Sequence, residues 1–451
     1  MKKRKFQLKP SQIIPLGFLG LILAGTVLLM LPISTASGEI PEFSTALFTS
    51  TSSVCVTGNV VVDTFSYWST FGHIVILFLI QMGGLGIVAV VSLVIVTAKR
   101  RKSLVNMMLL RDSFNLDSMR GVAPFISRVF KGTIVVEALG AFGYFFAFIP
   151  QFGVVRGVWI SFFTSVSAFC NAGMDIIGPN SLAPYYNRPL VLIVTMFLII
   201  AGGIGYVIWF DIWSTHRNYF VKKRKRGLGM NEHTKLVLSM TAILIVGGAV
   251  LIFFLEKNNP ATIGKMTLWE KMLNSTFQSV TYRTAGFVTV PQEALLEPTT
   301  VIGDILMFIG GSPVGTAGGV KTVTIYVLFV NVDSCMRGNY EPMAFKRRIT
   351  DDMIRKATAI VVFHFLLAIL FTFTLMIYEG IPFIDSVYEV MSGLNTVGVS
   401  RGITADLNIE GRIIMIAAMY LGRIGPVSIA LFFPGGPDGR VRSSKGKFII
   451  G

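Results

Sequence analysis

One motif occurs four times in this chain: Ala46-Leu-Phe-Thr-Ser-Thr-Ser-Ser-Val-Cys-Val-Thr-Gly58, Ser161-Phe-Phe-Thr-Ser-Val-Ser-Ala-Phe-Cys-Asn-Ala-Gly173, Asn274-Ser-Thr-Phe-Gln-Ser-Val-Thr-Tyr-Arg-Thr-Ala-Gly286 and Ser386-Val-Tyr-Glu-Val-Met-Ser-Gly-Leu-Asn-Thr-Val-Gly398. Each copy ends on a glycine, and an aromatic residue lies nine or ten positions before that glycine. The intervals between successive glycines are 115, 113 and 112 residues. This near-constant spacing indicates four internal repeats.

Long apolar runs flank the four copies of the motif. The chain of 451 residues is 53% hydrophobic and 14% charged, whereas a soluble protein carries about a quarter charged residues. Most of the runs approach or exceed the roughly 20 residues that a membrane-crossing helix needs. The first run lacks an Ala-x-Ala-like cleavage site, so we expect a retained span. The eight expected spans are Ile13–Ile33, Phe71–Thr97, Ile134–Ile149, Leu190–Phe210, Leu236–Leu255, Ile302–Val332, Ala357–Tyr378 and Ile413–Phe433.

Each motif copy is too short to cross a bilayer as a helix, so it must enter the membrane and return on the same side. Non-helical backbone survives at that depth only where it is buried in protein or lines a watery cavity. The sequence therefore predicts an all-α integral membrane protein with four repeats around one central pore. Each repeat consists of a span, a re-entrant pore half-helix and a second span (M1-P-M2). We expect the repeats to occupy residues 1–98, 99–213, 214–333 and 334–451.

The net charge of +16 is distributed unevenly between the two sides of the expected spans. Five segments on one side (1–11, 98–131, 214–235, 333–356 and 434–451) hold 30 of the 40 lysines and arginines. Because cytoplasmic loops carry the excess of basic residues, we expect these segments and both termini in the cytoplasm of a multi-pass cell membrane protein. The basic runs are then interpreted as topology determinants, with binding of lipid headgroups or docking of a partner as the alternative. Membrane lipids are expected as partners, and nucleic acid is not.

The motif copies have the chemistry of an ion filter. Gathered around one axis, their backbone carbonyls could replace the hydration shell of a cation, and the negative ends of the half-helices would favour it. The glycines would supply the positive φ that turns carbonyls inward. No ring of acidic residues occurs there, which favours a monovalent ion and leaves K⁺ or Na⁺ open. The expected filter residues are Cys55, Val56, Thr57, Gly58, Cys170, Asn171, Ala172, Gly173, Thr284, Ala285, Gly286, Asn395, Thr396, Val397 and Gly398.

Patterns for other chemistry are missing from the sequence. The three cysteines and four histidines are isolated, and neither Cys-x-x-Cys nor His-Glu-x-x-His occurs. The stretch from Gly315 to Lys321 resembles a phosphate-binding loop, but Val320 separates its last glycine from the lysine. We therefore expect no organic cofactor and no enzyme activity.

The four glycine signatures resemble those of the Trk/Ktr/HKT superfamily of potassium transporters: Val56-Thr-Gly-Asn59, Phe169-Cys-Asn-Ala-Gly-Met174, Arg283-Thr-Ala-Gly-Phe287 and Asn395-Thr-Val-Gly-Val399. The resemblance covers nearly the whole chain and is strongest to the KtrB type of membrane subunit. It implies K⁺ uptake by a homodimer with one pore per protomer and a cytosolic ring of nucleotide-binding KtrA-type regulatory subunits. Na⁺ as an activator is also implied. Cys170 and Asn59 depart from the usual pattern, which affects the expected fine selectivity.

The span that follows the third motif copy contains a stretch rich in glycine, which a continuous helix tolerates poorly. We expect an unwound intramembrane gate loop there, in line with the resemblance. Arg423 lies at a similar depth in the last span and could cap carbonyls of the loop, as could Lys321. The expected gate residues are Gly310, Gly311, Ser312, Pro313, Val314, Gly315, Thr316, Ala317, Gly318, Gly319, Lys321 and Arg423.

Other glycine clusters and charges have plainer interpretations. Gly83-Gly84-Leu-Gly86 and Gly202-Gly203-Ile-Gly205 are expected to allow close helix packing. Arg283 is expected to brace the third filter segment from behind, and Glu137 to pair with another repeat. A coupled transporter would show inverted repeats with ionisable groups at the midplane, and a membrane enzyme would need a clustered nucleophile, metal site or carboxylate pair. Both alternatives fit this sequence less well than a cation pore.

Overall fold

The protein is described here by a computed structural model, which describes residues 10–86, 122–221, 230–338, 341–345 and 347–425. Parts of the second and last expected spans (87–97 and 426–433) lie outside these residues, as do the basic segments 98–121 and 222–226 and the C-terminal tail. The described helices are α1 (Pro10–Leu29), α2 (Phe43–Cys55), α3 (Thr64–Tyr67), α4 (Thr70–Leu85), α7 (Val122–Phe152), α8 (Val154–Cys170), α9 (Pro189–Gly203), α10 (Tyr206–Val221), α11 (Glu232–Glu256), α12 (Leu268–Thr281), α13 (Glu297–Phe308), α14 (Thr322–Met336), α15 (Asp351–Glu379), α16 (Phe383–Leu394) and α17 (Ile409–Ile424).

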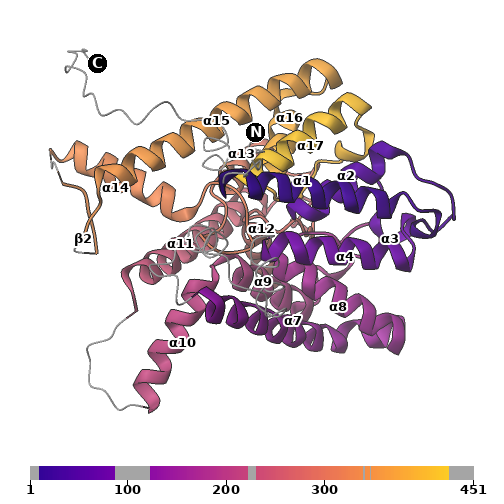
Figure 1. The fold of residues 1–451 in the computed structure, drawn as a ribbon, viewed down its shortest axis with the longest axis horizontal. Helices are drawn as coiled ribbons and strands as arrows, with labels where there is room; N and C mark the ends of the chain where they lie inside the picture. The colour runs from indigo at the N-terminus through magenta and orange to yellow at the C-terminus, as the bar shows by residue number, and fades with distance from the viewer. Residues whose placement is uncertain (1–9, 87–121, 222–229, 339–340, 346, 426–451) are drawn as a thin grey trace, which may run out of the picture.

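The chain is mostly helical, as predicted. Three 3₁₀ turns (Pro32–Ser34, Ala183–Tyr185 and Thr404–Asp406) lie in loops. The one described departure from helix and loop is a small antiparallel ribbon of β1 (Met343–Ala344) and β2 (Arg347–Arg348). Figure 1 shows this ribbon, α10 and α14 on the left of the molecule, with α3 on the opposite side.

Three described helices are long and apolar enough to cross a membrane: Phe125–Phe152, Glu232–Glu256 and Asp351–Glu379. Each of the three exposes large apolar side chains, such as Phe146 at 64%, Phe254 at 60% and Ile377 at 75%. Water would not tolerate so many exposed apolar residues on one surface, whereas lipid would. These helices therefore belong in a membrane.

Two of the expected spans are broken. The helix over Leu190–Phe210 bends by 96° between α9 and α10, which was not predicted. The helix over Ile302–Val332 ends at Phe308 and resumes at Thr322, and this break was predicted from its glycines. The bent pair counts as a fourth membrane span if α9 and α10 are taken together.

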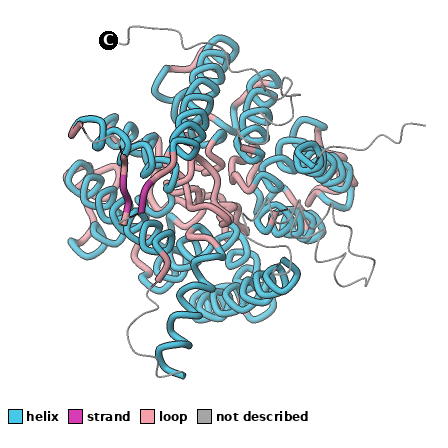
Figure 2. Tube along the Cα trace, turned by 60° about the vertical axis from the view of Figure 1, so that its left-hand side comes forward, coloured by secondary structure: helices cyan, strands magenta, loops and turns pink. Residues whose placement is uncertain are grey.

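The helices pack in four groups that form a closed ring. Within the groups, α1 packs with α2 and α4, α7 with α8 and α9, α11 with α12 and α13, and α15 with α16 and α17. Neighbouring groups meet through the pairs α4 and α8, α9 and α12, α13 and α16, and α17 and α2. In Figure 2, loop segments fill the middle of the molecule and helices surround them.

Three groups share one anchoring contact between the short helix and the helix before it. Ser50, Ser165 and Ser279 each donate a hydrogen bond to a backbone carbonyl of that helix, over 2.7, 2.7 and 2.9 Å. In each group, a glycine three residues after the accepting residue lies directly against the serine. These glycines (Gly25, Gly140 and Gly248) let the two helices approach closely. The contact fixes the position of each short helix along the helix that precedes it.

Candidate ion-conducting site

The four motif copies share one backbone conformation. Each short helix ends three to five residues before the motif glycine. The φ angles of Gly58, Gly173, Gly286 and Gly398 are +100°, +67°, +82° and +94°, which confirms the predicted positive φ. The backbone before each glycine therefore leaves the helix and turns toward the middle of the four helix groups.

A second positive φ occurs two positions before each glycine, which the sequence analysis missed. Val56, Asn171, Thr284 and Thr396 have φ between +52° and +68°. Three of these residues are β-branched and disfavour this region strongly. Strained backbone of this kind persists only where the surrounding structure imposes it, and it clusters at functional sites. Nothing in the residue types, apart from the tolerance of Asn171, could have signalled it.

The four glycines meet in a closed cycle. A Cβ atom added to Gly58 would lie 2.5 Å from the carbonyl oxygen of Ala172, and one on Gly173 would lie 2.7 Å from that of Ala285. The cycle continues from Gly286 to Val397, at 2.8 Å, and closes from Gly398 onto Thr57. We call this cycle the glycine ring. Each position needs glycine for its φ angle and because the carbonyl of the next segment fills the space of a side chain.

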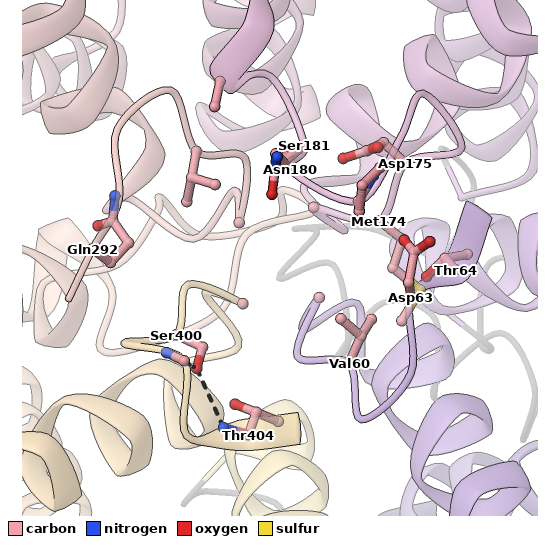
Figure 3. Close-up of a pocket in the computed structure, with 18 of the residues that line it drawn as sticks. Val60, Asp63, Thr64, Met174, Asp175, Asn180, Ser181, Gln292, Ser400 and Thr404 are labelled. Carbon is pink, nitrogen blue, oxygen red and sulfur yellow. Dashed lines mark hydrogen bonds between the residues drawn. The ribbon is translucent and has the colours of Figure 1, made fainter. Parts of the chain in front are cut away.

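A cavity of about 540 Å³ opens on one side of the glycine ring and is lined by all four glycines. Residues from all four groups of helices surround this vestibule (Figure 3). Its lining includes three acidic residues, Asp63, Asp175 and Glu293. None of the three belongs to the glycine ring, so acidic charge lies near the ring but outside it.

Some of the predicted filter side chains point away from the ring. Cys55 and Cys170 are the last residues of α2 and α8, and the Cys170 Sγ lies 3.5 Å from the Gln81 Oε1 of α4. The Asn395 side chain hydrogen bonds with the His364 ring, over 2.9 Å. What the glycine ring brings together is backbone, namely the carbonyls of Thr57, Ala172, Ala285 and Val397.

The predicted gate loop runs between α13 and α14 and contacts the break between α9 and α10. The Ser312 N–H donates to the Gly203 carbonyl over 2.9 Å, and the Tyr206 N–H donates to the Val314 carbonyl over 3.0 Å. The Thr316 N–H donates to the Gly202 carbonyl over 3.1 Å. The prediction that Gly202 and Gly203 serve helix packing was therefore incomplete. Their helix ends there, and its free carbonyls bind the loop.

Arg423, the next-to-last residue of α17, reaches the loop from the fourth group. Its guanidinium donates to the Thr316 carbonyl over 2.7 Å and to the Gly83 carbonyl over 2.6 Å. Capping of loop carbonyls by Arg423 was predicted, but this bond is one of several that hold the loop. Lys321 donates to the carbonyls of Ala317 and Gly318, over 2.6 and 3.3 Å.

The gate loop lies against the helix-side end of the fourth filter segment. A Cβ on Gly318 would lie 2.8 Å from the Asn395 carbonyl oxygen and against the Thr396 side chain. A separate cavity of about 280 Å³ is lined by the loop, Lys321, His364 and Arg423. The glycine ring and the loop thus lie between two cavities, one acidic and the other basic in its lining.

The remaining predicted charges have these partners. Arg283 is buried and its Nη2 lies 3.5 Å from the Gly310 carbonyl, so it contacts the start of the gate loop as well as adjoining the filter. Glu137 accepts a bond from Gln81 of another helix group, over 3.3 Å, which confirms the predicted pairing. Within the expected spans and motif copies, the sequence analysis missed two buried acids, Asp304 and Glu389, at 8% and 0% exposure. Their charge within expected membrane segments was the available signal.

Together, the apolar helices and the central ring of carbonyls define a membrane protein with polar backbone at its centre. The profile of the family described as "TrkH: Cation transport protein" matches residues 9–441. The chain is 37% identical over 434 residues to the potassium/sodium uptake protein NtpJ of Enterococcus hirae, covering 95% of this chain and 94% of that one. It is 36% identical to the Ktr system potassium uptake protein B of Bacillus subtilis, covering 98% and 97%.

The fold agrees with these sequence matches. The crystal structure of the potassium transporter TrkH from Vibrio parahaemolyticus superposes with a TM-score of 0.75 at 16% identity, covering 96% of this chain and 86% of that one. The chain therefore belongs to the TrkH family of cation transport proteins. Because this family consists of transporters, the expectation that the chain is not an enzyme is confirmed.

Proposed function

We propose that this protein takes up K⁺ across the cell membrane through the glycine ring. The observation that carries the proposal is the closed cycle of four glycines at the base of the vestibule. A ring of carbonyl oxygens with no carboxylate suits a weakly hydrated monovalent cation. The C-terminal ends of α2, α8, α12 and α16 precede the ring and would add negative potential. The names of the relatives from E. hirae and B. subtilis support K⁺ as the substrate.

In this proposal, the four helix groups are the four M1-P-M2 repeats, with boundaries at residues 98, 213 and 333. The filter comprises the residues from Cys55 to Gly58, Cys170 to Gly173, Thr284 to Gly286 and Asn395 to Gly398. Both termini lie in the cytoplasm, so the vestibule opens to the outside. The support is the placement of basic residues on one side of the spans.

The proposed gate is the loop from Gly310 to Gly319, with Lys321 and Arg423. The loop obstructs the route beneath the ring, and the two cations lower the occupancy of K⁺ there while it is closed. The support is the contact of Gly318 with the fourth filter segment and the bond from Arg423 to Thr316. Opening then requires the loop to leave the carbonyls of Gly202 and Gly203.

The proposed assembly is a homodimer that binds a cytosolic ring of nucleotide-binding KtrA-type subunits, with Na⁺ as an activator. The name of the B. subtilis relative, a Ktr system protein, supports such a system. The name of the E. hirae relative includes sodium, which supports a role for Na⁺.

The proposal is tested by ⁸⁶Rb⁺ uptake into liposomes that contain the purified protein. Unlabelled K⁺ should compete strongly, and Li⁺ should compete weakly. Uptake should be measured over a range of external Na⁺, because an activator raises the rate at concentrations below those at which Na⁺ displaces Rb⁺. Equal competition by K⁺ and Li⁺, or no uptake above protein-free liposomes, would contradict K⁺ transport through the ring.

A further inference from the structure

Glu389 is a fully buried carboxylate on α16 that the proposed filter and gate do not use. It accepts hydrogen bonds from the Arg401 N–H over 3.0 Å, from the Thr404 hydroxyl over 2.6 Å and from the Ser400 hydroxyl. It also accepts one from the Asn59 side chain over 3.4 Å. Arg401 directs its guanidinium to Asp385 instead, over 2.6 Å. None of the ion pairs among the described residues includes Glu389.

The donors to Glu389 come from two neighbouring segments of the glycine ring. Asn59 directly follows Gly58, and the loop with Ser400 and Thr404 follows Gly398. A further bond joins Asn59 directly to the Thr404 hydroxyl, over 3.2 Å. Ser400 and Thr404 lie side by side at the edge of the vestibule (Figure 3). The carboxylate therefore links the first and fourth segments where they leave the ring.

The third helix group holds the loop after its glycine without a carboxylate. Gln278 of α12 donates to the Gln292 side chain over 2.6 Å. Gln292 lies six residues after Gly286, just as Thr404 lies six residues after Gly398. The Tyr388 hydroxyl and the Arg401 guanidinium also donate to Gln292, over 2.8 and 3.0 Å, so this loop is held by donors and amides and needs no acid on the short helix. The negative charge of Glu389 is not needed for that task alone, which points to a role in the passage of cations.

We propose that Glu389 is a positioning residue that sets the ion preference at the outer end of the glycine ring. It holds the exits of Gly58 and Gly398 at a fixed separation. It also adds, behind the ring, a negative charge that no basic side chain neutralises. A rigid ring that favours the larger, more weakly hydrated K⁺ over Na⁺ is the expected result. This inference rests on the proposed function of the ring.

The first variant is Glu389→Gln, which keeps the size of the side chain and removes its charge. It also places an NH₂ group, which is itself a hydrogen-bond donor, beside the groups that donate to the carboxylate in the wild type. Hydrogen bonds to a charged group are stronger than bonds to a neutral one, so the variant should hold the exits of the ring less rigidly. We therefore expect Na⁺ to compete with ⁸⁶Rb⁺ uptake at roughly tenfold lower concentration than in the wild type.

Glu256→Gln is the matched control. Glu256 is also a buried carboxylate, at 1% exposure, and it accepts bonds of 2.7, 2.7 and 2.9 Å from Asn259, Thr262 and the Leu296 N–H. It lies at the end of α11 and does not line the vestibule. The ratio to compare is the Na⁺ concentration that halves ⁸⁶Rb⁺ uptake, divided by the unlabelled Rb⁺ concentration that does so. Glu256→Gln should keep the wild-type ratio. An equal change in both variants would show a general loss of stability and overturn the inference.

Two more variants keep the test decisive if Glu389→Gln does not assemble. Asn59→Val removes the link to the first segment and leaves the charge, so it should shift the ratio in the same direction but less. Asn59→Asp combined with Glu389→Gln returns a negative charge to the same cluster and should restore part of the discrimination. An unchanged ratio in well-folded Glu389→Gln and Asn59→Val proteins would overturn the inference.

Gly398→Ser separates this inference from the proposed function. If Gly398→Ser changes the ratio and Glu389→Gln does not, only the role of Glu389 is wrong. If neither variant changes the ratio while uptake persists, the ring itself is not the filter.

Discussion

Gly58, Gly173, Gly286 and Gly398 are constrained twice, by their positive φ and by the neighbouring carbonyls. Replacing any of them with serine would strain the backbone by roughly 1–3 kcal/mol and push the facing carbonyl aside. We expect each Gly→Ser variant to weaken discrimination of K⁺ against Na⁺ by about tenfold. The measurement is inhibition of ⁸⁶Rb⁺ uptake by each ion, with protein levels matched. Wild-type preference in all four variants would contradict the carbonyl ring.

Asp175 gives the vestibule a pH-dependent charge. Burial raises the pKa of Asp175 to about 6, and the bond from the Ile177 N–H opposes that rise, while the nearby Asp63 adds to it. The carboxylate is therefore ionised above about pH 6 and neutral below it. Because the negative charge attracts cations to the ring, the KM for Rb⁺ should rise as pH falls from 7.5 to about 5.5.

The same pH series on Asp175→Asn separates this carboxylate from other titrating groups. The variant should show, at pH 7.5, the higher KM that the wild type reaches only in acid, and its KM should change little with pH. A wild-type pH profile in the variant would exclude Asp175 as the cause.

At the residue scale, the sequence reveals positions that need glycine but not the strain beside them. The four glycines were predictable because one residue type recurs at fixed spacing. The left-handed backbone of Val56, Thr284 and Thr396 was not, since β-branched residues argue against it. Contacts among all four segments impose that conformation, and a single segment carries no sign of them.

At the scale of helices, one short motif ends three of the described helices, α4, α9 and α17. Gly83, Gly202 and Gly422 each lie against the carbonyl of a residue near the end of a short helix, namely Val54, Phe169 and Leu394. Three residues later, Gly86, Gly205 and Gly425 have positive φ. Arg423 therefore occupies the place that Gly84 and Gly203 have in the other two copies. The sequence analysis took the first two of these clusters for packing sites because helix packing and helix ending both favour glycine.

The gate proposal makes its prediction at this scale. Arg423→Ala removes bonds to the carbonyls of Thr316 and Gly83, each contributing roughly 1.5–3 kcal/mol because the donor is charged. It also lowers the positive potential along the route. We expect basal ⁸⁶Rb⁺ flux without the cytosolic partner to rise by about tenfold, with ion preference near wild type.

Deleting Pro313–Gly315 should raise basal flux further, because it also removes the Val314 carbonyl that accepts a bond from Tyr206. The bonds to Gly202 and Gly203 would hold the loop in Arg423→Ala, so the deletion should have the larger effect. Lower or unchanged flux in both variants, at equal membrane levels, would refute the gate and leave the filter proposal intact.

At the scale of the whole molecule, much of the arrangement followed from periodicity. Apolar runs and four glycines were enough to predict a helical membrane protein with central polar segments. The links between helix groups were not predictable, because they join residues far apart in the chain. The bonds from Asn59 to Glu389 and from Arg423 to Gly83 are examples.

The orientation of the molecule provides its last prediction. If basic segments are cytoplasmic, the vestibule and its rim face outward. Ser66 and Asn180 are exposed in the described residues, and Asn180 lines the vestibule. Arg224 belongs to a basic segment outside the described residues. In intact cells, Ser66→Cys and Asn180→Cys should react with a membrane-impermeant maleimide, whereas Arg224→Cys should react only after permeabilisation.

The native cysteines supply the control for this labelling. Cys55 and Cys170 are buried. Cys335 is exposed near the end of α14, in the segment 333–356 that is expected in the cytoplasm. The wild type should therefore label only after permeabilisation, and the three variants are best made with Cys335 changed to serine. Labelling of Arg224→Cys in sealed cells, with Asn180→Cys protected, would reverse the orientation. The ring would then lie at the cytoplasmic end of the route and the gate loop outside it, so a cytosolic ring of subunits could not act on the loop directly.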